Sequence, residues 1–176
     1  PCTPGSYQSA ADSSGCTPCD AGKYCAGTGL TAISGWCPAG SYSASGASTS
    51  SCTTCDPGKY CAQLGLSVVS GECQVGSFSA GGATAITCTP CSPGSYQPFT
   101  AQGACLSCSA GMYCEGSGLT AVSGSCQVGS YSPGGARNVS CIPCPLGTFQ
   151  AVAGQQSCAP CTRGSFCDAF GLTAAV

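Results

Sequence analysis

Cysteine is the residue type whose number and spacing could support chemistry in this chain. Twenty of the 176 residues are cysteine, and they form six Cys-x-x-Cys pairs. Such pairs occur in zinc sites, in redox-active dithiols and at the junctions of disulfide-bonded modules. The chain has no histidine, which is the commonest metal ligand and general base. We therefore expect disulfides, with no metal and no cofactor, and keep a zinc-binding cysteine array as the alternative.

The cysteines belong to a repeat of 17 or 18 residues in which Cys-x-x-Gly-x-(Tyr/Phe) occurs ten times. We call the first cysteine of each copy the lead cysteine and the glycine three residues later the turn glycine. The lead cysteines are Cys2, Cys19, Cys37, Cys55, Cys73, Cys91, Cys108, Cys126, Cys144 and Cys161. The repeat predicts ten modules, at residues 1–18, 19–36, 37–54, 55–72, 73–90, 91–107, 108–125, 126–143, 144–160 and 161–176. The tenth copy breaks off within its motif, so we expect a fragment of a longer array.

Each module contains one further cysteine, which we call the closing cysteine. It follows the lead cysteine by 14 or 15 residues in the long-loop modules, at Cys16, Cys52, Cys88, Cys105, Cys141 and Cys158. It follows by only six in the short-loop modules, at Cys25, Cys61, Cys114 and Cys167. The simplest pairing joins the two cysteines of each module, and the Cys-x-x-Cys pairs are then junctions. Spacing leaves other pairings open, such as Cys25 with Cys37.

The composition predicts a fold that depends on these bridges. Leu, Ile, Val and Phe make up only 23 residues, too few to fill the core of one domain of this size. The recurrent glycine indicates a turn with positive φ or a close backbone approach, and the aromatic two residues later starts a short strand. We expect small disulfide-rich β modules in tandem, with short hairpins and no large hydrophobic core. They would form an elongated, rod-like repeat array in which each module contacts only its neighbours.

The motif resembles known extracellular repeats. Cys37-Pro38-Ala39-Gly40-Ser41-Tyr42 followed by Cys52-Thr53-Thr54-Cys55 is similar to the ephrin-receptor-like Cys-rich repeats and to the first part of tumour-necrosis-factor-receptor Cys-rich domains. That resemblance implies a bond between Cys37 and Cys52 and between their equivalents. The short-loop form, Cys55-Asp56-Pro57-Gly58-Lys59-Tyr60-Cys61, is similar to Cys-rich arrays on protist and algal surfaces, including flagellar-hair (mastigoneme) shaft proteins.

Charge and sequence patterning exclude several functions and leave three. With four basic residues and a net charge of −2, nucleic-acid binding is not expected, and no apolar run is long enough to span a membrane. The acidic residues are scattered singly, so we expect no enzyme, and Asp20 and Asp56 should cap turns. We expect an extracellular, cell-surface structural protein of a filament or coat, with a mastigoneme-like shaft as the most specific form. A receptor or adhesin ectodomain, including a variable surface antigen, is the alternative, and a metal-binding array the third.

Partners and modifications follow from a few exposed positions. Asn138 begins the N-glycosylation sequon Asn138-Val139-Ser140. The Ser- and Thr-rich loops, such as residues 41–51, could carry O-glycans. Trp36, Phe99 and Phe170 lie outside the aromatic repeat, and we expect them either to wedge between modules or to contact a neighbouring chain. The expected partners are therefore glycans and copies of this or other chains of a filament.

Overall fold

The structure, a computed structural model, describes residues 1–10, 15–45, 47–50 and 52–176. Part of the loop 41–51 thus lies outside the described residues. Within the described residues the secondary structure consists of short strands, isolated bridges, turns and bends, and no helix. The prediction of small β modules with short hairpins is confirmed.

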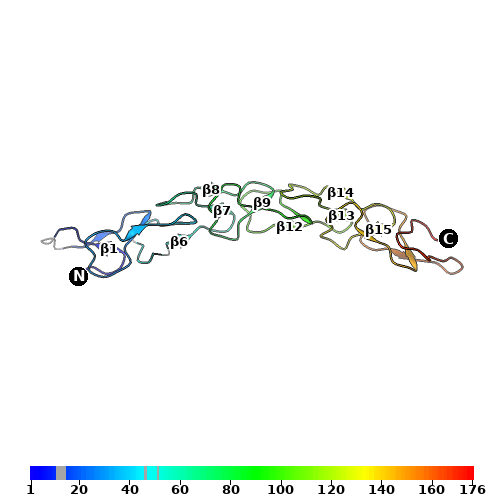
Figure 1. Cartoon of the computed structure of the whole chain (residues 1–176), viewed down its shortest axis with the longest axis horizontal. Helices are drawn as coiled ribbons and strands as arrows, with labels where there is room; N and C mark the ends of the chain where they lie inside the picture. Colours follow the sequence, from blue (N-terminus) through cyan, green and yellow to red (C-terminus); the bar gives the residue numbers. More distant parts are fainter. Residues whose placement is uncertain (11–14, 46, 51) are drawn as a thin grey trace. The chain divides into compact units, whose positions relative to one another are not determined.

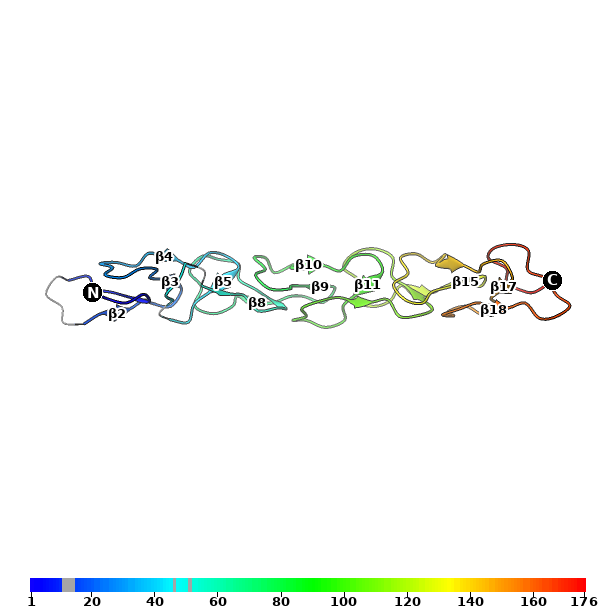
Figure 2. The ribbon, with the colours of Figure 1, turned by 90° about the horizontal axis from the view of Figure 1, so that it is seen from below.

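Each strand is two residues long and pairs with one other strand in an antiparallel hairpin. The first strands are β1 (Ser6–Tyr7), β3 (Lys23–Tyr24), β5 (Ser41–Tyr42), β7 (Lys59–Tyr60), β9 (Ser77–Phe78), β11 (Ser95–Tyr96), β13 (Met112–Tyr113), β15 (Ser130–Tyr131) and β17 (Thr148–Phe149). Their partners are β2 (Thr17–Pro18), β4 (Gly35–Trp36), β6 (Thr53–Thr54), β8 (Gly71–Glu72), β10 (Thr89–Pro90), β12 (Leu106–Ser107), β14 (Gly124–Ser125), β16 (Ile142–Pro143) and β18 (Ala159–Pro160). Figure 1 shows β13 beside β14, and Figure 2 shows β3 beside β4 and β17 beside β18. The repeated aromatic is the second residue of every first strand.

The ten disulfides join the two cysteines of each module. The long-loop bonds are Cys2–Cys16, Cys37–Cys52, Cys73–Cys88, Cys91–Cys105, Cys126–Cys141 and Cys144–Cys158. The short-loop bonds are Cys19–Cys25, Cys55–Cys61, Cys108–Cys114 and Cys161–Cys167. These pairs include all twenty cysteines. Closing a loop of about 15 residues removes unfolded-chain entropy worth on the order of 3 kcal/mol.

The buried interior is made of sulfur and backbone. The buried apolar side chains of the described residues are all cysteines, and the buried polar ones are serines and Gln97. Fourteen large apolar side chains in the described part of the chain are instead exposed. The prediction that no large hydrophobic core exists is confirmed, so cohesion must come from the bridges and from backbone hydrogen bonds.

The chain divides into two compact units, each of which is made of one long range and two short ranges of the sequence. Unit 1 comprises Pro1–Gln74, Phe78–Thr89 and Thr100–Ala104. Unit 2 comprises Val75–Ser77, Pro90–Phe99 and Cys105–Val176. Every disulfide and every hydrogen bond discussed below lies within one unit.

Candidate functional site: the junction between successive modules

The turn glycine occupies the position that only glycine adopts without strain. In module 2 the N–H of Lys23 donates to the carbonyl of Asp20 (3.1 Å), and Gly22 between them has a φ of +78°. This is a type II turn, whose third residue requires positive φ. Positive φ recurs at all ten turn glycines, so the predicted turn is confirmed. The turn directs the glycine's N–H and carbonyl toward the next module.

Both backbone groups of each turn glycine are bonded to the following module. The carbonyl accepts the N–H of the next lead cysteine, as Gly22 does from Cys37 (2.9 Å). The N–H donates to the carbonyl six residues beyond that cysteine, as Gly22 does to Ser43 (2.8 Å). The same two bonds are made in unit 1 by Gly5, Gly22, Gly40 and Gly58, and in unit 2 by Gly76, Gly94, Gly111, Gly129 and Gly147. One backbone interface is therefore repeated at every junction.

Two further backbone bonds recur at the junctions of the described residues. The N–H six residues after a lead cysteine donates to a carbonyl in the next module's loop, as Gln97 does to Leu119 (2.8 Å). The lead cysteine's own carbonyl accepts an N–H from that loop, as Cys91 does from Gly118 (2.8 Å). The donor in this second bond is glycine throughout the described residues except at Ala101, which has a φ of +58° and bonds to Cys73. These bonds use no side chains, so they tolerate sequence variation in the loops.

Several turn glycines also lie against the module after next. A Cβ added to Gly40 would lie 2.7 Å from the carbonyl oxygen of Gly82, two modules further on. At Gly94 it would lie 2.6 Å from that of Gly135. Real Cβ atoms do not approach backbone so closely, so these positions accept no side chain. The expectation that each module contacts only its neighbours is wrong, because sequence spacing alone does not reveal that the loops overlap.

Trp36 lies in a contact between modules. It ends β4, directly before lead cysteine Cys37, and its ring lies against the backbone of Gly65 in module 4, where a Cβ would be 3.1 Å from Cζ3. The Nζ of Lys23, its cross-strand neighbour, is 4.9 Å from the ring centroid, in range for a cation–π interaction. Lys23 also pairs with Asp20 (2.8 Å). Trp36 nevertheless remains 57% exposed.

The other charged and aromatic positions are mostly exposed. Phe99 is 64% and Phe170 66% exposed. Lys59 and Asp56 repeat the ion pair of module 2 across the turn of module 4 (3.6 Å). At the turns where Asp20 and Asp56 were expected to act as caps, each also forms an ion pair with the lysine three residues later. Exposed pairs of this kind contribute at most about 1 kcal/mol.

The residue six positions after the lead cysteine correlates with the loop type, a relation that was not predicted from the sequence. It is glutamine where the cysteines are 14 apart, and Gln150 accepts the N–H of Val152 (3.1 Å) and donates to the carbonyl of Ser157 (2.8 Å). It is serine where they are 15 apart, and Ser132 accepts the N–H of Gly134 (3.0 Å). In short-loop modules it is the closing cysteine itself. The alternation of Gln, Ser and Cys at this repeat position, in step with the cysteine spacing, is the sequence pattern that could have indicated the loop type.

The disulfides leave no thiolate for chemistry. Because all twenty cysteines are bonded to one another, none can act as a metal ligand or nucleophile without prior reduction. Among the described residues, no cluster of three or more His, Cys, Asp or Glu side chains is placed to hold a metal ion. The same residues include no helix with the length and hydropathy needed to cross a membrane. What the geometry provides is a repeated, covalently closed scaffold.

Tandem disulfide-closed hairpins with a common backbone junction define the chain as a disulfide-rich repeat protein of extracellular type. The family model described as tyrosine-protein kinase ephrin type A/B receptor-like matches residues 76–126 and 129–172, more than half of the chain. The chain therefore belongs to this ephrin-receptor-like family, whose Cys-rich repeats are a non-catalytic type of domain. No curated protein matches the chain.

Proposed function

We propose that this protein is a structural component of an extracellular filament or coat on a cell surface. In this proposal the chain is not an enzyme, and its modules form a stiff, glycosylated scaffold. The most specific form of the proposal is the shaft of a mastigoneme-like flagellar hair. We also propose that the structural repeat has the ten module boundaries given above.

The observation that carries the proposal is the identity of the junctions. Nine successive junctions use the same turn-glycine bonds, made by main-chain atoms, while the loop side chains vary. A ligand-binding site requires a module that differs from the others, with a concave surface and converging polar groups. A scaffold requires instead that every junction hold equally well. The repeated junction therefore supports a mechanical role over a recognition role.

Disulfide content supports the extracellular location. Disulfides in this number are typical of proteins in an oxidising compartment, such as the extracellular space. Reduced thiols at the same positions would abolish the loop closures that substitute for a hydrophobic core. Lateral assembly is supported by the low net charge, because little electrostatic repulsion opposes it. Trp36, Phe99 and Phe170 are the side chains proposed to contact neighbouring chains.

A receptor or adhesin ectodomain is the second candidate. The observation in its favour is Trp36, an exposed aromatic beside the Asp20–Lys23 ion pair, since aromatic residues are enriched in binding hot spots. This surface occurs once, because Glu72 and Ser125 occupy the position of Trp36 in the other complete short-loop modules.

Electron microscopy of the native cell surface with an antibody against this chain tests the proposal. Regularly spaced label along fibres or a coat is the expected result. Soluble monomers that bind a defined ligand would instead favour the receptor. Replacing Trp36, Phe99 and Phe170 together by serine should weaken fibre association while leaving the disulfide map unchanged. Fibres that form equally well with the triple variant would show that these side chains are not the lateral contacts.

A further inference from the structure

The loop of module 8 combines a glycosylation sequon with a fixed backbone. Asn138 and Ser140, the acceptor and the hydroxyl residue of the sequon, are both exposed. The N–H of Cys141 donates to the carbonyl of Asn138 (3.2 Å), and the carbonyl of Val139 accepts the N–H of Gln127 (3.4 Å). The Cys126–Cys141 disulfide closes the same loop. The main chain of the sequon is thus bonded on both sides.

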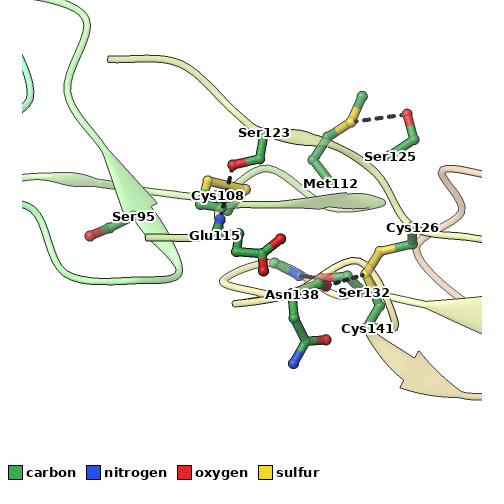
Figure 3. The surroundings of a disulfide bond; sticks show 12 residues. Ser95, Cys108, Met112, Glu115, Ser123, Ser125, Cys126, Ser132, Asn138 and Cys141 are labelled. Carbon is green, nitrogen blue, oxygen red and sulfur yellow. Dashed lines mark hydrogen bonds between the residues drawn. A yellow bond between two sulfur atoms is a disulfide. The ribbon is translucent and has the colours of Figure 1, made fainter. Parts of the chain in front are cut away.

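The side chain of Asn138 is directed away from this support. Figure 3 shows the side-chain amide of Asn138 extending away from the Cys126–Cys141 bridge. The main-chain carbonyl oxygen of Asn138 instead faces the sulfur of Cys141 at 3.5 Å. Cys141 is disulfide-bonded and has no S–H to donate, so that approach is a contact only. The Asn138 amide nitrogen is therefore accessible to a large sugar donor without opening the loop.

A shallow cavity of about 230 Å³ lies beside the sequon. Asn138 itself lines it, together with Ser132, Gly135, Ala136, Arg137 and Ile142. A lining that combines the apolar residues Ala136 and Ile142 with polar residues such as Ser132 and Arg137 suits a pyranose ring, whose C–H face is apolar and whose hydroxyl groups donate and accept hydrogen bonds. A sugar attached to Asn138 would have a high local concentration at this cavity because it is tethered to the rim.

We propose that Asn138 carries an N-linked glycan and that its first N-acetylated sugar covers the cavity of module 8. The new bond joins Nδ2 of Asn138 to the anomeric carbon of that sugar. The bond from that carbon to the pyrophosphate of a lipid-linked oligosaccharide breaks, the pyrophosphate leaves with its electron pair, and one amide proton passes to a base of the transferase. This assignment rests on the extracellular location in the proposed function, because the donor and the transferase act in the secretory pathway.

Module 5 offers a matched control within the chain. Ala85 occupies the loop position of Asn138, and Thr87 occupies that of Ser140. The backbone is also alike, because the N–H of Cys88 donates to the carbonyl of Ala85 (3.0 Å) and both Cys88 and Cys141 have a φ of +47°. Ala85→Asn therefore creates a second sequon on an equivalent loop. If loop geometry makes the acceptor accessible, this second site should be glycosylated as well.

The experiment is secretion of the full chain from a eukaryotic cell, followed by mass spectrometry of its glycopeptides and a non-reducing disulfide map. We expect a glycan on Asn138, its loss in Ser140→Ala, and a second glycan in Ala85→Asn. The cavity contact predicts that the Gly135 N–H, which donates to Cys108 (2.8 Å), exchanges with solvent about fivefold more slowly in the glycosylated protein than in Ser140→Ala.

The outcomes separate this assignment from the proposed function. A secreted, fully disulfide-bonded chain without sugar on Asn138 overturns the glycan and leaves the extracellular scaffold standing. A chain that is retained in the cell with free thiols contradicts the proposed function. An occupied Asn138 with unchanged exchange at Gly135 overturns the cavity contact. An Ala85→Asn chain that carries no glycan on the new asparagine overturns the argument that loop geometry makes the acceptor accessible.

Discussion

The close approach of turn glycines to the module after next should be measurable with two alanine substitutions. Gly94 and Gly147 occupy the same position in modules 6 and 9, with φ values of +92° and +81°. Both bond to the next module in the same way. A Cβ on Gly94 would meet the carbonyl oxygen of Gly135 at 2.6 Å, whereas a Cβ on Gly147 would meet no atom of the described residues within 4 Å. The pair therefore separates backbone strain from steric exclusion.

The magnitudes follow from these contacts. Positive φ costs about 1–2 kcal/mol for alanine at either site. In Gly94→Ala the backbone around Gly135 must also move to make room for the Cβ. This movement weakens the hydrogen bond from Gly135 to Cys108 and the hydrogen bond from Cys114 to Ala136. At about 1 kcal/mol for each bond, Gly94→Ala should be about 2 kcal/mol more destabilising than Gly147→Ala.

Amide hydrogen exchange of the oxidised protein is the appropriate assay, because repeat proteins open locally rather than in one step. A difference of 2 kcal/mol means that exchange at the junction contacted by Gly94 should accelerate about 30-fold more in Gly94→Ala than exchange at the junction of Gly147 does in Gly147→Ala. A disulfide map of each variant controls for mispairing. Equal loss of protection in the two variants would refute the steric contact between a module and the second module after it.

Three further predictions concern single features of the same scaffold. Ala101→Gly should stabilise the chain by about 1 kcal/mol, because Ala101 has a positive φ where the equivalent residues are glycine. The amide hydrogen of residue 101 should then exchange more slowly, and an unchanged exchange rate would contradict the prediction. Gly65→Ala should displace the ring of Trp36, the single tryptophan, so the emission maximum of the chain should shift; an unchanged spectrum would mean that the two do not pack. Under limiting reductant, the Cys2–Cys16 disulfide should be reduced before Cys19–Cys25, because Cys16 is exposed whereas both cysteines of the second pair are buried. Alkylation and peptide mapping would reveal the order of reduction, and the reverse order would contradict the burial argument.

Much of the fold could be predicted because the repeat marks it directly. Glycine at a fixed place between cysteine and an aromatic predicts a positive-φ turn followed by a strand, and both are present at Gly22 and Tyr24. The lack of large aliphatic residues correctly predicted an interior without a hydrophobic core. Short-range chemistry was enough for these features, because each depends on residues within one module.

Contacts between modules could not be predicted in the same way. The closeness of Gly40 to Gly82 depends on how far each loop folds back over the array, which spacing does not encode. The alternation of glutamine, serine and cysteine six residues after the lead cysteine was visible, yet its meaning required the hydrogen bonds of Gln150 and Ser132. Trp36 could be recognised as atypical, but its packing on Gly65 and Lys23 depends on how the strands and modules fold together, which its own position in the sequence does not indicate.

Amide exchange before and after selective reduction tests most directly whether sulfur bridges and main-chain bonds, rather than apolar packing, hold the modules together. With the disulfides intact, the N–H groups of turn glycines such as Gly22 and Gly94 should be among the best protected in the chain. After mild reduction and alkylation, their protection should fall to that of an unfolded peptide. Protection that survived reduction at these glycines would contradict the account.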